Sequence, residues 1–95
     1  MQAIAIDQRF IINQEVVYTQ VDNEMVMMDP EDGDYHGLNP VGAELWMLLE
    51  KNAMSLKDIV GYLKKTYMLK DEIAMTDAHA FVSAMLSQDF LILSE

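Results

Sequence analysis

The chain has 95 residues, and its 16 acidic and 6 basic side chains give a formal net charge of −10 at pH 7. Phosphate backbones bind to surfaces rich in lysine and arginine, so this charge argues against a nucleic-acid partner. The chain has no cysteine, which excludes disulfides and thiolate chemistry and fits a reducing compartment. Residues 1–7 lack the features of a signal peptide and no apolar run has the length of a membrane span, so we expect one cytoplasmic domain over residues 1–95.

The acidic side chains are concentrated in the amino-terminal half. Residues 1–50 contain ten acids and a single base, Arg9, whereas residues 51–95 contain six acids and five lysines. An acidic surface can keep a small domain soluble and protect sheet edges, or it can attract a basic partner. The sequence leaves both interpretations open.

Four segments before residue 39 have the composition of strands or extended chain. They are residues 10–12, 16–21, 25–29 and 34–38. Turn-forming residues lie between the later segments, and Gly33 among them can take a positive φ. The sequence therefore predicts an antiparallel meander of about three strands, which must lay one face on helices to be stable.

The period of the apolar residues changes near residue 40. Asn39 can cap a helix and Pro40 suits a first helical position, so the pattern predicts a helix over residues 40–51. Trp46 and Met47 widen its apolar stripe beyond the face that a surface helix needs. We expect this helix to be covered on two sides.

A second helix is predicted over residues 56–67. Ser55 and Asp58 have the spacing of a capping box, and apolar residues follow at helical intervals. Residues 68–75 are of mixed charge and are predicted to form a connection.

A third helix is predicted to begin after Thr76 and to run to about Gln88. Its buried stripe is expected to be Ala78, Phe81, Val82, Met85 and Leu86. Residues 90–93 form an apolar tail that we expect to pack on the core. Strands followed by helices predict an α+β fold.

No group of side chains has the pattern of a catalytic or metal site. His36 and His79 are the only imidazoles, and neither has a second ligand at helical spacing. An acid, a histidine and a serine at Asp77, His79 and Ser83 would project from one helix in different directions, which argues against a triad. We therefore expect a binding protein with no cofactor and no metal, and not an enzyme.

Three motifs follow one another along the chain. They are Leu38-Asn39-x-x-Gly42-Ala43-x-x-Trp46-x-Leu48-Leu49, Ile59-Val60-x-x-Leu63-x-x-x-Tyr67 and Asp77-x-x-x-Phe81-Val82-x-x-Met85. This ordered set, over roughly residues 25–93, resembles the PqqD family of leader-peptide recognition domains. Gly33-x-Tyr35-x-x-Leu38-Asn39 further resembles the small discrete members that serve lasso-peptide pathways. The family often ends its third helix with a glycine, where this chain has Gln88-Asp89.

The resemblance implies a winged-helix-like domain, with a three-stranded antiparallel sheet followed by three helices. Such a domain binds the leader segment of a ribosomally made precursor peptide and presents it to a leader peptidase or another modifying enzyme. The leader adds as a strand beside the third strand, in a groove whose other wall is the third helix. In these two elements the expected peptide-binding residues are Asp34, Tyr35, His36, Gly37, Leu38, Asp77, Ala80, Phe81 and Ala84.

Other functions stay open at this point. A PqqD-like chaperone in another modified-peptide pathway, such as that of pyrroloquinoline quinone, would share these features. A winged-helix transcriptional regulator fits the same fold outline, but the net charge and the lack of lysine or arginine between Asp77 and Gln88 argue against it. A free-standing scaffold or dimerisation domain is a third possibility.

Two features allow a structural or a functional interpretation. Nine methionines, three of them at Met25, Met27 and Met28, suit either an irregular core or a surface that accommodates varied apolar side chains. Gly37 either lets a partner backbone come close or marks a bulge at a sheet edge.

Overall fold

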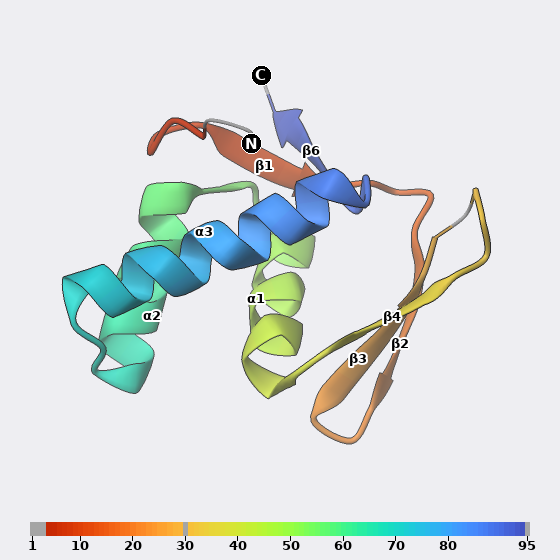
Figure 1. The fold of residues 1–95 in the computed structure, drawn as a ribbon, viewed down its shortest axis with the longest axis horizontal. Coiled ribbons are helices and arrows are strands. Elements are labelled where there is room, and N and C mark those ends of the chain that lie inside the picture. The colour runs from red at the N-terminus through yellow and green to blue at the C-terminus, as the bar shows by residue number, and fades with distance from the viewer. Residues whose placement is uncertain (1–3, 30, 95) are drawn as a thin grey trace.

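Helix α1, Pro40–Lys51, lies at the centre of the computed structural model, between two three-stranded antiparallel sheets (Figure 1). The structure describes residues 4–29 and 31–94. The start of α1 is as predicted, because the Asn39 side chain accepts a hydrogen bond from the Gly42 amide at 2.8 Å and Pro40 is the first residue. Trp46 is fully buried, and α1 contacts strands of both sheets, so the expected cover on two sides is confirmed.

The predicted meander is formed by β2 (Val17–Val21), β3 (Glu24–Met28) and β4 (Tyr35–Leu38), in the order β2-β3-β4. The turns that join these strands include two residues with positive φ, Asp22 at 58° and Gly33 at 76°. In the order β2-β3-β4, strand β4 lies at one edge of the sheet.

One face of the meander packs on the core. Met25 and Met27 on β3 are buried, and the Tyr18 ring meets Trp46 edge to face with 5.4 Å between centroids. These two methionines thus fill the core, in line with the structural interpretation of the methionine content.

A second sheet, which the sequence did not predict, has the order β5-β1-β6. Its strands are β1 (Arg9–Ile12), β5 (Met54–Ser55) and β6 (Leu91–Ser94). β1 lies in the first segment that was predicted to be extended. It pairs with β5 on one side and β6 on the other, and both are far from it in the sequence. The expected packing of residues 90–93 on the core is confirmed for Phe90 and Leu91, which are buried, but not for Ile92 and Leu93, which are exposed.

Helix α2, Leu56–Tyr67, has the predicted bounds. Both bonds of the capping box are present: the Asp58 amide donates to the Ser55 hydroxyl oxygen at 3.1 Å, and the Ser55 amide donates to the Asp58 carboxylate at 3.0 Å. The turn after α2 begins at Met68, which takes a left-handed conformation with φ 56°.

Helix α3, Asp71–Ser87, begins earlier than predicted. The prediction that residues 68–75 form a connection was wrong, and so was the capping role of Thr76, whose hydroxyl donates to the Glu72 carbonyl inside the helix at 2.8 Å. Acidic residues in the first turn favour this earlier start. Ala74 is fully buried and extends the stripe of Ala78 and Val82 by one turn, which holds the extra turn against the core.

Helix α3 ends without the glycine that is common after the last turn of a helix. Asp89 takes a left-handed conformation with φ 59°, which aspartate tolerates better than most residues. The Phe90 amide then donates to the Met85 carbonyl at 2.9 Å, and the Asp89 amide donates to Leu86 at 3.1 Å. This closure turns the chain back toward the core and into β6.

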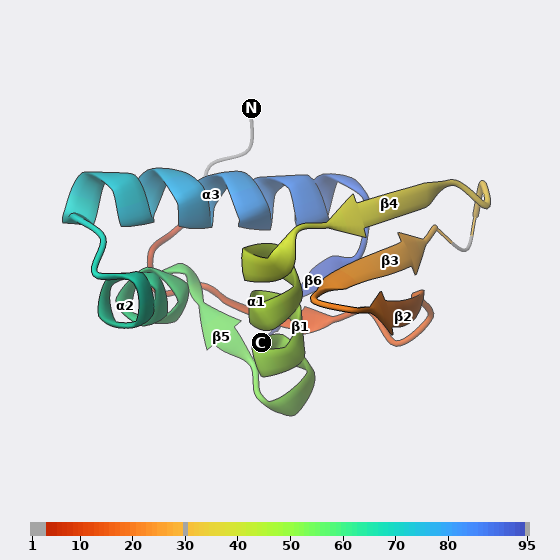
Figure 2. The same ribbon diagram turned by 90° about the horizontal axis from the view of Figure 1, so that it is seen from below.

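The arrangement of α3, β4 and α1 is what positions the candidate site. Figures 1 and 2 show α3 and β4 on the same side of the molecule, with α1 beneath the space between them. None of the helices in the described ranges has both the length and the apolar character needed to cross a membrane.

Candidate functional site

An open groove of about 440 Å³ lies between β4, α1 and α3. Its lining comes from the end of β4, the first turns of α1 and one flank of α3. The lining residues are Gly37, Leu38, Asn39, Val41, Gly42, Leu45, Asp77, Ala80, Phe81, Ala84 and Met85. Most of these side chains are apolar, so the groove suits apolar side chains of a ligand.

The wall of the groove that α3 forms is shallow, because the side chains along it are short. Asp77, Ala80 and Ala84 are exposed and lie at i, i+3 and i+7 along one flank of α3. Phe81 is partly buried between this flank and the core. Two alanines leave room above the helix backbone, and the Asp77 carboxylate adds a single charge at the wall.

The strand wall of the groove has a free backbone edge. The Asp29 amide donates to the Asp34 carbonyl at 2.9 Å, and further along the ladder Met27 is opposite His36. Residue pairs in an antiparallel ladder alternate between hydrogen-bonded and non-hydrogen-bonded. This alternation directs the backbone groups of His36 toward β3 and leaves the N–H and C=O groups of Tyr35 and Gly37 facing away from it.

Six of the nine residues predicted to bind a peptide line this groove. They are Gly37, Leu38, Asp77, Ala80, Phe81 and Ala84. The structure thus brings together one end of the predicted strand and one flank of the predicted helix. That these residues bind a peptide stays a prediction.

The other three predicted residues lie elsewhere. Asp34 precedes β4, and its amide donates to the Asp32 carboxylate at 2.9 Å. The Tyr35 side chain is 74% exposed. The His36 ring packs edge to face on Phe90, with 5.2 Å between centroids. Neither the Tyr35 nor the His36 side chain lines the groove, although the backbone of Tyr35 belongs to the edge of β4 that faces away from β3.

Sequence reasoning missed the floor of the groove, which α1 supplies through Val41, Gly42 and Leu45. Gly42 lies close to β4, since a Cβ atom added there would lie 3.4 Å from the Leu38 Cβ. The signal was present in the width of the apolar stripe of α1, but only the tertiary arrangement turns part of that stripe toward the groove.

The shifted titratable groups among the described residues lie outside the groove. Burial, followed by the Glu50 carboxylate, raises the pKa of Tyr18, and burial, followed by Glu44, raises the pKa of Tyr67. The Ser55 amide lowers the pKa of Asp58. Over residues 4–29 and 31–94, no three side chains of the metal-ligating types cluster together.

Two solved structures have a fold similar to that of this chain. The first similar solved structure, "TbiB1 in Complex with the TbiA(beta) Leader Peptide", has a TM-score of 0.75 and 28% sequence identity, over 85% of this chain and 93% of that chain. The second, "Lasso peptide synthetase B1 complexed with the leader peptide", has a TM-score of 0.73 and 25% identity, over 87% of this chain and 96% of that chain. A search of curated proteins found no match.

The profile of the family described as coenzyme PQQ synthesis protein D (PqqD) matches residues 24–91, which include β3, β4 and all three helices. This segment is well over half of the chain and contains all the residues that line the groove. The chain therefore belongs to the PqqD family.

Proposed function

We propose that this chain is an adaptor that binds the leader segment of a ribosomally made precursor peptide. The leader adds as a strand to the free edge of β4, and its apolar side chains enter the groove between β4, α1 and α3. The adaptor then presents the precursor to a leader peptidase or another modifying enzyme of a lasso-peptide pathway.

One observation carries the proposal: the free edge of β4 and the apolar groove lie next to each other. Tyr35 and Gly37 offer backbone groups that face away from β3 and have no partner among residues 4–29 and 31–94, and Gly37 and Leu38 line the groove. A ligand strand along β4 would place alternate side chains toward the low wall formed by Ala80 and Ala84. The two similar structures are complexes with leader peptides, which supports the same type of ligand here.

The energetics require both parts of the site. Ordering the leader costs about 1–2 kcal/mol per residue in backbone entropy. Each backbone hydrogen bond contributes only about 0.5–1.5 kcal/mol net, which does not exceed the entropy cost of ordering one residue. Strand pairing alone is therefore too weak for useful affinity. Burial of an apolar leader side chain contributes roughly 1.5–3 kcal/mol, so two or three such side chains in the groove offset the cost of ordering.

The role needs no chemistry from this chain. We assign the bond-breaking and bond-forming steps to partner enzymes, and we place the adaptor in the cytoplasm, where precursor peptides are synthesised. A PqqD-like chaperone of another modified-peptide pathway remains the second candidate, because the family profile includes proteins of coenzyme PQQ synthesis.

A methylation scan of the leader tests the mode of binding. A fluorescent peptide with the leader sequence of a lasso precursor peptide is titrated with the protein, and anisotropy gives the affinity. Tyr35 and Gly37 are two residues apart, so methylating the leader amides in one alternating register should abolish binding, and methylating the other register should spare it. Equal tolerance at every amide would rule out strand addition.

Choice of ligand separates the candidate functions. We expect the lasso-type leader to bind more tightly than a scrambled peptide of the same composition and more tightly than a precursor peptide of the pyrroloquinoline quinone type. Preference for the last peptide would favour the second candidate. Binding to none of the three would remove the leader-adaptor role.

A further inference from the structure

The meander has a second apolar surface, on the face opposite to the core. Met25 and Met27 point inward, so strand alternation places Val26 and Met28 outward. The ladder register sets these two residues beside outward-facing neighbours on β2 and β4. We define the outer apolar face as Val17, Thr19, Val26, Met28 and Tyr35.

Most of this face is open to solvent in the described structure. Val17 is 58% exposed and Tyr35 is 74% exposed. Together with Tyr18, the five residues line a shallow hollow of about 150 Å³. Contiguous apolar surface of this kind on a small domain is typical of an interaction site.

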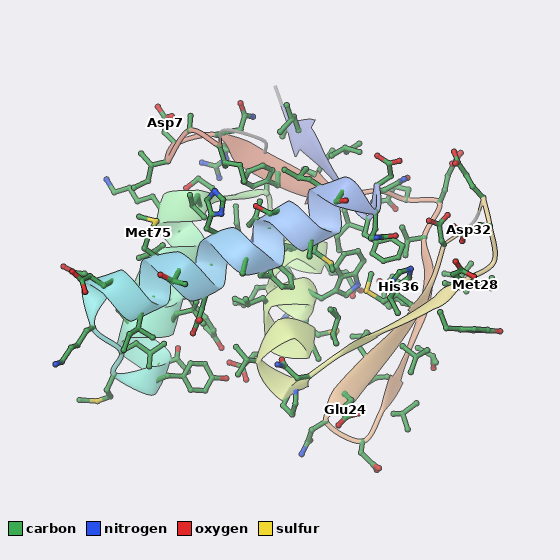
Figure 3. All side chains as sticks on the ribbon, viewed as in Figure 1. Asp7, Glu24, Met28, Asp32, His36 and Met75 are labelled. Atoms are coloured by element: carbon green, nitrogen blue, oxygen red, sulfur yellow. The ribbon has the colours of Figure 1, made fainter. Side chains whose placement is uncertain are left out.

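The charges around the face restrict what can cover it. The meander and its turns, residues 17–38, contain six acids and no lysine or arginine. Figure 3 shows two of these acids, Glu24 and Asp32, at opposite ends of the sheet. A second copy of this chain would bring acidic rims together, whereas a surface rimmed by lysine and arginine would be attracted.

The face is continuous with the proposed leader site. The Tyr35 side chain belongs to the outer apolar face, while its backbone N–H and C=O lie at the free edge of β4. A leader strand added at that edge would extend the same sheet, and every second leader side chain would join the outer face. A protein docked there would contact adaptor and leader together.

We propose that the outer apolar face docks the leader peptidase that acts on the precursor, through an apolar patch of that enzyme rimmed by lysine and arginine. The inference rests on the proposed function, because the enzyme must meet a leader held at β4. The leader lies along the edge of β4 with alternate side chains in the groove, and the enzyme docks on the face of the sheet opposite to the groove.

A charge placed in the centre of the face tests this proposal. Val17→Glu adds an acid to the apolar centre, and Ile92→Glu is the matched control, since Ile92 is an exposed β-branched residue on the other sheet, at 42% exposure. Binding of each variant is measured to the purified leader peptidase of the same lasso-peptide pathway as the leader and, separately, to the fluorescent leader. Circular dichroism checks the fold, and Val17→Thr, which keeps the branched shape, gives a milder second variant.

We expect Val17→Glu to weaken peptidase binding at least tenfold and to leave leader affinity within twofold, with a smaller loss for Val17→Thr and no change for Ile92→Glu. Peptidase affinity should also fall as salt rises from 50 to 500 mM, because the screening length falls to under about 5 Å. An unchanged peptidase affinity in Val17→Glu would overturn the proposal.

Three other results would also overturn it. They are equal losses of leader and peptidase affinity in Val17→Glu, absence of peptidase binding to the wild-type chain with its leader, and a wild-type dimer in light scattering that Val17→Glu dissociates. Failure of the leader alone to bind would instead count against the proposed function, so the two failures can be told apart.

Discussion

The imidazole ring of His36 contacts the ring of Phe90 edge to face, with centroids 5.2 Å apart and planes at 77°. Phe90 follows the end of α3 and is fully buried, while His36 lies on β4, so the pair joins the strand wall of the groove to the chain beyond the helix wall. Such aromatic contacts contribute about 0.5–1.5 kcal/mol beyond burial.

Burial of the His36 ring also lowers the stability of the fold through one polar atom. Its Nε2 atom is buried and has no hydrogen-bond partner among the described residues. His36→Phe keeps the ring contact and removes the polar atom, so we expect the free energy of unfolding in urea to rise by about 1 kcal/mol. His36→Ala should lower it by roughly 1–3 kcal/mol, because the contact with Phe90 is lost. A destabilised His36→Phe variant would indicate that Nε2 has a partner in solution.

Ala84→Arg tests the helix wall of the groove. Ala84 is exposed and lines the groove, so a long cation at this position should fill the space of a leader side chain without harming the fold. We expect leader affinity to fall by more than about 2 kcal/mol and the free energy of unfolding to change by less than about 0.5 kcal/mol. Anisotropy titration and urea unfolding measure the two quantities.

Thr76→Arg is the control for that variant, because Thr76 is exposed on α3 and does not line the groove. Leader affinity should stay within about 0.5 kcal/mol of wild type. If a folded Ala84→Arg variant keeps full leader affinity, the leader lies elsewhere. If it fails to fold, Ala84 belongs to the core rather than to the wall.

The capping box at the start of α2 predicts a pH dependence of stability. The Ser55 amide lowers the pKa of Asp58, so the folded-state value is below the unfolded value of about 3.9. A lowered carboxyl pKa stabilises the fold above the unfolded pKa, and this contribution is lost as pH falls through the folded pKa. Asp58→Asn should therefore melt below wild type at pH 7, with the difference in Tm shrinking below about pH 4. An equal difference at pH 7 and pH 2.5 would contradict this.

The bounds of α1 and α2 could be predicted because their signals are local. Asn39 with Pro40 and Ser55 with Asp58 mark the two starts by hydrogen bonds within a few residues. The start of α3 has no such signal, since Lys70 makes no side-chain cap bond there. Its first turn is held by the burial of Ala74, which depends on the tertiary fold.

The second sheet and the floor of the groove could not be predicted from sequence patterns, because both depend on contacts between segments that are far apart in the chain. β6 pairs with β1 across most of the chain, so a four-residue apolar tail carries no sign of its partner. Composition and helical spacing predicted the strand and the helix that form the walls, whereas their role as two walls of one groove followed from the resemblance to the PqqD family. The floor depends on how α1 sits beneath β4 and α3, which no periodicity encodes.

The edge of β4 gives the sharpest test of strand addition within the protein itself. The N–H of Gly37 faces the free edge, whereas the N–H of His36 faces β3. Gly37→Pro should therefore remove a leader hydrogen bond and keep the sheet, and the loss of about 1 kcal/mol would weaken leader binding on the order of fivefold. His36→Pro should damage the sheet, because it removes a bond to β3.

Gly37→Ala is the matched control for the proline variant. A Cβ atom at Gly37 meets no atom within 4 Å, so alanine should be tolerated in the free protein, and it keeps the N–H group. Anisotropy titration of the labelled leader should show a clear loss for Gly37→Pro and near wild-type affinity for Gly37→Ala, while circular dichroism shows both variants folded. Equal losses in both would mean that the leader backbone needs the glycine itself, through a close approach rather than a hydrogen bond. Full affinity in a folded Gly37→Pro variant would contradict pairing of the leader with this residue.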